Sequence, residues 1–145
     1  MLTNDTKNRM EIALASSPAR DDLVKALGIG GATFTIGAES ADVINVGIQL
    51  EDDDGNDLAA VTAVEVWLFA DANGTAINTN DYDTIAIGTD GVLVERVADK
   101  ILDCTCESDG DLDIDLTEAS TTPTAYVGVK LGDGSFAISG AVTHA

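Results

Sequence analysis

The sequence predicts a mainly β protein, an antiparallel immunoglobulin-like β-sandwich preceded by a short N-terminal helical arm. From Ala32 onward, apolar and polar residues alternate in short runs rich in β-branched side chains. Dipeptides such as Asp54-Gly55 and Asn73-Gly74 separate these runs and accept the positive φ angles of tight hairpin turns. Most of the 26 acidic residues are aspartates, which favour turns over helices. We expect residues 1–30 to form the arm and residues 31–145 the sandwich.

The arm is the stretch with helical periodicity. Ser17-Pro18 offers an N-cap with proline at the first helical position, and Gly28 follows the last apolar residue, where helices commonly end. The apolar side chains at three- and four-residue spacing include Met10, Leu14, Leu23 and Leu27. Either this stripe packs on the chain's own domain, or it binds another protein.

Nine strands are expected in the body, and they follow one another without helices. Their ranges are 32–36, 43–50, 63–70, 84–88, 92–97, 101–106, 111–116, 124–131 and 135–143. In two of them every second side chain is apolar, which predicts one buried and one solvated face; these are Ile44, Val46, Ile48, Leu50 and Leu112, Ile114, Leu116.

The strand at 63–70 is apolar on both faces. Val64, Val66 and Leu68 share one face, while Trp67 and Phe69 share the other with Glu65. Either the strand is central and covered on both sides, or Trp67 and Phe69 form a contact patch for a partner.

Charge is distributed unevenly along the chain, which has a formal net charge of −19. Residues 1–27 hold four cations and four anions, so the whole net charge lies on residues 28–145, whose cations are Arg96, Lys100 and Lys130. Such acidity repels phosphate backbones and anionic lipid, so we expect neither nucleic acid nor membrane as a partner. The sequence also lacks an apolar run of about 18 residues and the layout of a signal peptide, so we expect a soluble chain.

Chemistry-bearing motifs are weak. The acidic segments 51–57 and 109–115 match no calcium-loop spacing, and we expect solvated carboxylates there, the alternative being an adventitious Ca²⁺ or Mg²⁺. Cys104 and Cys106 point to the same face of a strand and suit small buried side chains better than a disulfide or a zinc site. His144 is the one histidine, and no nucleophile elbow or phosphate loop occurs. We therefore expect no enzyme, no cofactor and no metal.

Five blocks of this sequence resemble a family of small proteins encoded near the capsid genes of tailed bacteriophages. The blocks are ADVINVGIQL at 41–50, VEVWLFA at 64–70, AIGTDGV at 86–92, SDGDLDIDL at 108–116 and SGAVT at 139–143. Some members of that family resemble virion decoration (cement) or head-fibre proteins with an immunoglobulin-like fold. The Cys104-Thr105-Cys106 segment departs from the plain aliphatic residues expected there.

The resemblance implies a structural capsid decoration protein, made in the host cytoplasm and located on the capsid surface of the virion. It also implies the major capsid protein as partner, with the helical arm as anchor. Because decoration proteins commonly occupy symmetric lattice sites, we expect a homo-oligomer, with a trimer favoured and Trp67 and Phe69 at its contact. The alternative is an immunoglobulin-like recognition module of a tail, neck or adhesin that binds host carbohydrate or protein, which would need solvent-facing aromatic residues among Trp67, Phe69, Tyr82 and Tyr126.

Overall fold

The computed structural model describes residues 28–145, which form nine strands and no helix. The strands are β1 Gly31–Ile36, β2 Val43–Glu51, β3 Ala63–Phe69, β4 Thr84–Ile87, β5 Val92–Val97, β6 Ile101–Thr105, β7 Asp111–Thr117, β8 Thr124–Lys130 and β9 Phe136–Thr143. All nine expected strands are present, with bounds within one residue of those expected. Of the expected helical arm at 1–30, residues 1–27 lie outside the described residues, and residues 28–30 are not helical. Within residues 28–145 no helix is long and apolar enough to cross a membrane.

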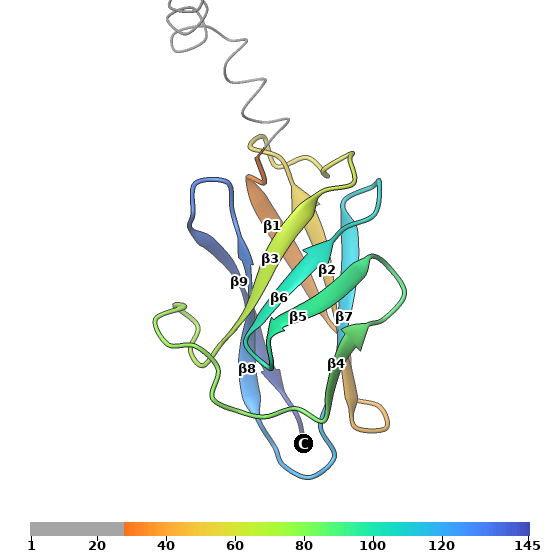
Figure 1. The fold of residues 1–145 in the computed structure, drawn as a ribbon, viewed down its shortest axis with the longest axis vertical. Coiled ribbons are helices and arrows are strands. Elements are labelled where there is room, and N and C mark those ends of the chain that lie inside the picture. Colours follow the sequence, from red (N-terminus) through yellow and green to blue (C-terminus); the bar gives the residue numbers. More distant parts are fainter. Residues whose placement is uncertain (1–27) are drawn as a thin grey trace, which may run out of the picture.

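Two antiparallel sheets face each other (Figure 1), so the expectation of a mainly β, two-sheet protein is confirmed. One sheet has the strand order β1-β2-β7-β4 and the other the order β5-β6-β3-β8-β9. At the two seams between the sheets β1 lies near β9 and β4 near β5. The β3 strand is therefore the middle strand of the larger sheet.

The core consists of the inward-facing side chains of both sheets. The expected alternation is confirmed, because every second side chain of β2 and of β7, the apolar one, is almost fully buried between the sheets. Core side chains with no more than 2 % exposure include Val46, Ile48, Leu50, Val66, Leu68, Leu102, Ile114, Leu116, Val127 and Val129. Each such side chain contributes about 1.5–3 kcal/mol relative to an exposed one, so this layer is the main source of stability.

The aspartate–glycine and asparagine–glycine turns differ from the tight two-residue form. In the turns at 52–56 and 71–75 only the glycine has a positive φ, 80° at Gly55 and 68° at Gly74. In both, the first aspartate uses its Oδ1 atom to accept the backbone N–H groups two and four residues later, at 2.9–3.1 Å. These are longer turns in which glycine supplies a left-handed residue after an aspartate-capped bend.

The turn between β1 and β2 is the one with two left-handed residues in a row. Ala41 has φ 51° and Asp42 has φ 67°, and Ser40 and Val43 exchange both backbone hydrogen bonds at 2.9 and 3.1 Å. This is a two-residue hairpin turn, for which asparagine and glycine are the favoured residues. Alanine there is strained because its Cβ crowds the following carbonyl oxygen.

We expect Ala41→Asn to raise the free energy of unfolding by about 0.5–1 kcal/mol, because asparagine tolerates the left-handed region better than alanine. Urea denaturation at neutral pH measures the change. Ala59→Asn is the matched control, since Ala59 is exposed and does not have a positive φ. Equal effects of both substitutions would show that the strain at Ala41 is absent in solution.

A candidate interaction face on the five-stranded sheet

An ion-pair network crosses the outer face of the five-stranded sheet. The strand register places Glu65 of β3 opposite Asp103 of β6, and Arg96 of β5 reaches both carboxylates. The Arg96 Nη2 atom lies 2.9 Å from Asp103 Oδ1, and Lys130 Nζ of β8 lies 3.2 Å from Glu65 Oε2. Each pair is partly exposed and contributes about 0–1 kcal/mol, so its main effect is to neutralise charge locally.

The charge pattern distinguishes this face from the rest of the body. Arg96 and Lys130 lie on it, and Lys100 follows in the β5–β6 turn, so all three cations of residues 28–145 belong to this sheet or its turns. Other surfaces of the body carry acids without a cation nearby in sequence. The outer face of the five-stranded sheet is therefore the part of the described surface where a negatively charged partner meets the least repulsion.

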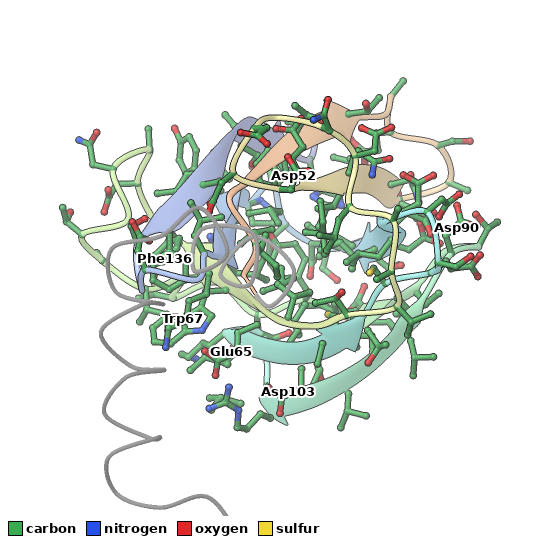
Figure 2. The ribbon with its side chains drawn as sticks, turned by 90° about the horizontal axis from the view of Figure 1, so that it is seen from above. Asp52, Glu65, Trp67, Asp90, Asp103 and Phe136 are labelled. Atoms are coloured by element: carbon green, nitrogen blue, oxygen red, sulfur yellow. The ribbon has the colours of Figure 1, made fainter. Side chains whose placement is uncertain are left out.

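An aromatic cluster, formed by Trp67, Phe69 and Phe136, lies beside the ion-pair network (Figure 2). Phe136 approaches Trp67 with ring centroids 5.2 Å apart, and meets Phe69 edge to face at 5.0 Å. Phe69 is only 4 % exposed, whereas Trp67 and Phe136 are half-buried. The Trp67 indole N–H is buried without a hydrogen-bond partner in the described structure.

This geometry bears on both alternatives for the strand at 63–70. The strand is central, and its outer face is covered at Phe69 by neighbouring strands and by the turn at 71–75. Trp67 keeps a partly open side. Binding of a partner by Trp67 and Phe69 stays a prediction. Within the single chain, Phe69 is the buried centre of the aromatic cluster on the outer face of the sheet. The other expected partner-binding residues, Met10, Leu14, Leu23 and Leu27, lie outside the described residues.

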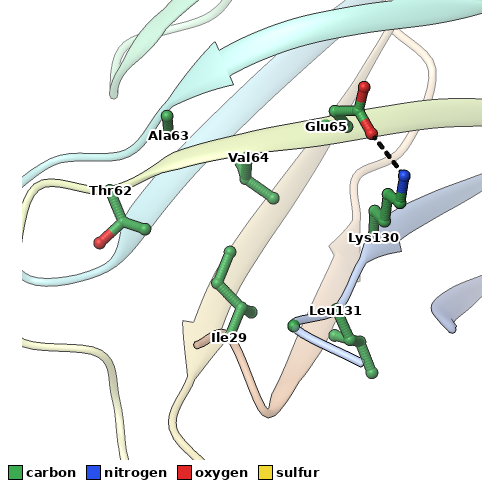
Figure 3. A pocket seen from close by; sticks show the side chains of 8 residues that line it. Ile29, Thr62, Ala63, Val64, Glu65, Lys130 and Leu131 are labelled. Carbon is green, nitrogen blue, oxygen red and sulfur yellow. Dashed lines mark ion pairs between the residues drawn. The ribbon is translucent and has the colours of Figure 1, made fainter. Parts of the chain in front are cut away.

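A hollow of about 250 Å³ opens where the chain enters the body (Figure 3). Ile29, Val64 and Leu131 give it apolar walls, and the Glu65–Lys130 ion pair lies at its rim. Gly132 donates a hydrogen bond to the Ile29 carbonyl at 2.9 Å, which holds Ile29 against the β8–β9 turn. Ile29 thus joins the core on one side and lines the hollow that also contains Glu65 and Lys130 on the other.

Sequence reasoning did not single out the exposed valines of β5. Val92 and Val94 are 62 % and 63 % exposed, and Val97 is 41 % exposed. The sequence of β5 carries one hint of this surface, because apolar residues occupy both faces of the strand at Val92, Leu93 and Val94. In the structure only Leu93 of these packs against the core. What could not be read locally was that this strand lies at the edge of its sheet.

The four-stranded sheet presents a different outer face, rich in carboxylates. The expectation of solvated carboxylates at 109–115 is wrong for Asp113, which is 8 % exposed. Its Oδ1 atom accepts the N–H groups of Thr89 and Asp90 at 2.8 and 2.7 Å, and its Oδ2 atom accepts Asn45 Nδ2 at 2.6 Å. Gly88 allows the loop at 88–91 to fold over the carboxylate, because a Cβ there would overlap Asp113 Oδ2 and Asn45 Nδ2.

The pKa values of Asp113 and of its neighbour Asp111 are shifted in opposite directions. Burial alone would raise the pKa of Asp113, but the hydrogen bonds from Asp90, Asn45 and Thr89 outweigh it, so the pKa lies below its usual value. At the neighbouring Asp111, burial and the charges of Asp109 and Asp90 act together and raise the pKa. Asp113 is therefore a structural carboxylate, whereas Asp111 experiences burial and the repulsion of nearby acids.

Remaining reactive side chains are buried. Burial, followed by the charge of Asp103, raises the pKa of the Cys104 thiol to about 12, and both cysteines are free. His144 is 1 % exposed and its Nε2 atom lies 3.1 Å from the Leu116 carbonyl. Burial raises the pKa of the adjacent Tyr82 to about 12, with smaller contributions from Asp99 and Glu118. No group of three or more potential ligand side chains that could hold a metal ion was found in residues 28–145.

Comparisons with protein-family models, with curated proteins and with solved structures gave no match to this chain. The functional argument therefore depends on its own residues and geometry.

Proposed function

We propose that this chain is a structural protein of a tailed-phage virion, a capsid decoration protein that binds the major capsid protein on the head surface. The observation that carries the proposal is the difference between the outer faces of the two sheets. One carries the three aspartates of β7, Asp111, Asp113 and Asp115, while the other combines paired charges with the aromatic cluster. A particle that displays many copies needs a hydrated acidic exterior against clumping and one less charged side for contacts.

The immunoglobulin-like part of the proposal is supported by strand order. The order β1-β2-β7-β4 corresponds to A-B-E-D of an immunoglobulin sandwich, and β3-β8-β9 corresponds to C-F-G. The β5–β6 hairpin extends the second sheet beside β3, where variable-type domains carry two extra strands. Here the hairpin follows β4 along the chain, whereas in variable domains the extra strands come before strand D.

The arm supplies the anchor in this proposal. Residues 1–27 hold four of the chain's seven cations and have no net charge, so they approach a partner without the repulsion that the body meets. The same segment carries the apolar stripe that includes Leu23 and Leu27. Next to its junction at Gly28, Ile29 lines the hollow that also contains Glu65 and Lys130, which supports an anchor near the ion-pair network.

The recognition-module alternative depends on solvent-facing aromatic side chains. Among its four candidates, Phe69 is 4 % exposed and Tyr82 is 8 % exposed. Trp67 and Tyr126 are half-buried. A carbohydrate platform needs an accessible ring face, so we rank this function second.

Immunogold electron microscopy of virions from the phage that encodes this chain tests the proposal. An antibody raised against the purified protein should label heads, because a decoration protein is repeated over the capsid surface. Label confined to tails or necks would favour the recognition module, and virions without label would contradict a virion role. Leu23→Asp combined with Leu27→Asp should abolish rebinding to heads stripped of the protein, whereas retained rebinding would place the anchor on the sandwich.

A further inference from the structure

The outer strand β5 leaves one of its long sides open. It pairs with β6 on one side and has no strand on the other within residues 28–145. Large apolar side chains that are exposed in the described residues are Ile36, Val61, Val92, Val94 and Val97. Three of these five belong to β5. Apolar side chains and unpaired backbone groups therefore coincide on one edge, which we call the β5 edge (Val92, Val94 and Val97).

Soluble proteins commonly protect such an edge. Usual devices are charged side chains, bulges, proline or a covering segment, because an open edge pairs with another strand. In β5 the protection covers only the second half, where the register shifts between Glu95 and Val97 and Arg96 turns to Glu65 and Asp103. The first half, from Val92 to Val94, is regular strand with exposed valines.

We propose that the β5 edge binds a second copy of this chain, with the two β5 strands antiparallel across a two-fold axis. A strand is complementary to itself in this arrangement, because its free N–H and C=O groups meet the same groups of the other copy in reverse order. The two five-stranded sheets then form one continuous sheet. Val92 and Val94 of the two copies become cross-strand neighbours on the outer face and lose part of their exposure to water.

Charge favours this edge over the other surfaces of the body as the place where two copies meet. Two chains of −19 repel each other, and repulsion is smallest where each copy carries its cations. Arg96 lies in β5 and Lys100 in the following turn, and Arg96 also neutralises Glu65 and Asp103. By contrast, the edge strand β4 pairs with β7, whose outer face carries the carboxylates of Asp111, Asp113 and Asp115.

Affinity should be modest. Stable complexes bury about 1,200–2,000 Å² in total, and a short edge contact supplies less. We therefore expect a reversible dimer that tightens with salt, because about 0.5 M salt screens charges beyond roughly 4–5 Å. A two-fold edge contact gives a dimer in place of the trimer expected from the sequence. The proposal concerns self-association in solution and does not depend on the virion function.

Sedimentation velocity of the full chain, over a range of concentrations at about 0.15 and 0.5 M salt, tests the proposal with Val94→Lys. The substitution should weaken the dimer at least tenfold, even though it lowers the net negative charge of each copy. Val61→Lys is the matched control, because Val61 is 65 % exposed and lies outside β5, against 63 % for Val94. It makes the same charge change and should leave the dimer unchanged or slightly tighter. Val94→Thr, which keeps a β-branched residue without adding charge, should weaken the dimer less than lysine.

Hydrogen exchange locates the contact directly. Backbone amides of residues 92–94 should exchange more slowly as the protein concentration rises, while those of β4 should not change. A monomer at every concentration and salt, a trimer, or equal effects of Val94→Lys and Val61→Lys would each overturn the proposal. Protection of residues 92–94 that is independent of concentration would also overturn it, since the edge would then be covered by the chain's own residues 1–27.

Discussion

Asp113→Ala should lower the free energy of unfolding by about 2–4 kcal/mol at neutral pH. Removing the carboxylate leaves the backbone N–H groups of Thr89 and Asp90 without their acceptor, while the Asn45 amide keeps only its bond to Asp115. Hydrogen bonds to a charged group contribute about 1.5–3 kcal/mol each before water replaces some of them. The loop at 88–91 should also lose its side-chain anchor on β7 and keep only the backbone hydrogen bonds between Gly88 or Asp90 and Asp113. Urea denaturation monitored by circular dichroism measures the loss.

Asp115→Ala is the control for that substitution. Asp115 lies on the same face of the same strand and accepts a hydrogen bond from the same Asn45 amide, at 2.7 Å, but it is more exposed. Both variants remove one negative charge from a chain of −19, which by itself relieves repulsion. Equal stabilities of the two variants would contradict the structural role assigned to Asp113.

The pH dependence has a definite sign. Because the pKa of Asp113 is lowered in the folded state, its contribution is present above the unfolded value of about 3.9 and is lost as pH falls through the folded value. The difference in stability between the wild type and Asp113→Ala should therefore shrink below about pH 4. A difference that is constant from pH 7 to pH 3 would mean that the carboxylate does not titrate as its contacts require.

Strand positions could be predicted because their signals are local. Alternation at β2 and β7 and glycine at the turns depend on residues within the strand or turn itself, and the structure matches them within one residue. The sheet to which each strand belongs is not local information. Nothing in the sequence of β5 says that it ends its sheet, so its valines were expected to be ordinary strand residues and not an exposed edge.

The same limit explains the errors at the carboxylates and turns. Asp113 and Asp115 are each flanked by two large apolar residues in sequence, and what distinguishes Asp113 is its contact with the loop at 88–91, over 20 residues away. His144 was a penultimate residue without a motif, yet it is buried against Tyr82 because β9 returns the chain to that end of the core. The burial of Asp113 and His144 depends on contacts with residues far away in the sequence, and the local sequence pattern does not predict such contacts.

Phe69→Ala should lower the free energy of unfolding by about 3–5 kcal/mol, the range for truncation of a buried phenylalanine. Phe69 packs over Gly128, where any Cβ would overlap its ring, and it contacts Trp67 and Phe136 at centroid distances of 6.1 and 5.0 Å. Gly74, in the turn at 71–75, also lies against the ring, since a Cβ there would be 3.6 Å from Phe69 Cε2 and Cζ. No equivalent side chain can fill the space left by the ring, so a cavity should form.

Phe136→Ala is the matched control, because Phe136 belongs to the same aromatic cluster but is half-buried, and it should cost less than half as much. The chain has one tryptophan, so the fluorescence of Trp67 reports the environment of the cluster directly, and its emission should shift to the red in Phe69→Ala. If Phe69 instead served mainly as a contact for a partner, its truncation would leave the free energy of unfolding within about 1 kcal/mol of the wild type and would weaken association. Denaturation and sedimentation of the same variant separate these outcomes. If Phe69 stabilises the fold of the single chain, Phe69→Ala lowers the free energy of unfolding even at concentrations where every copy is monomeric.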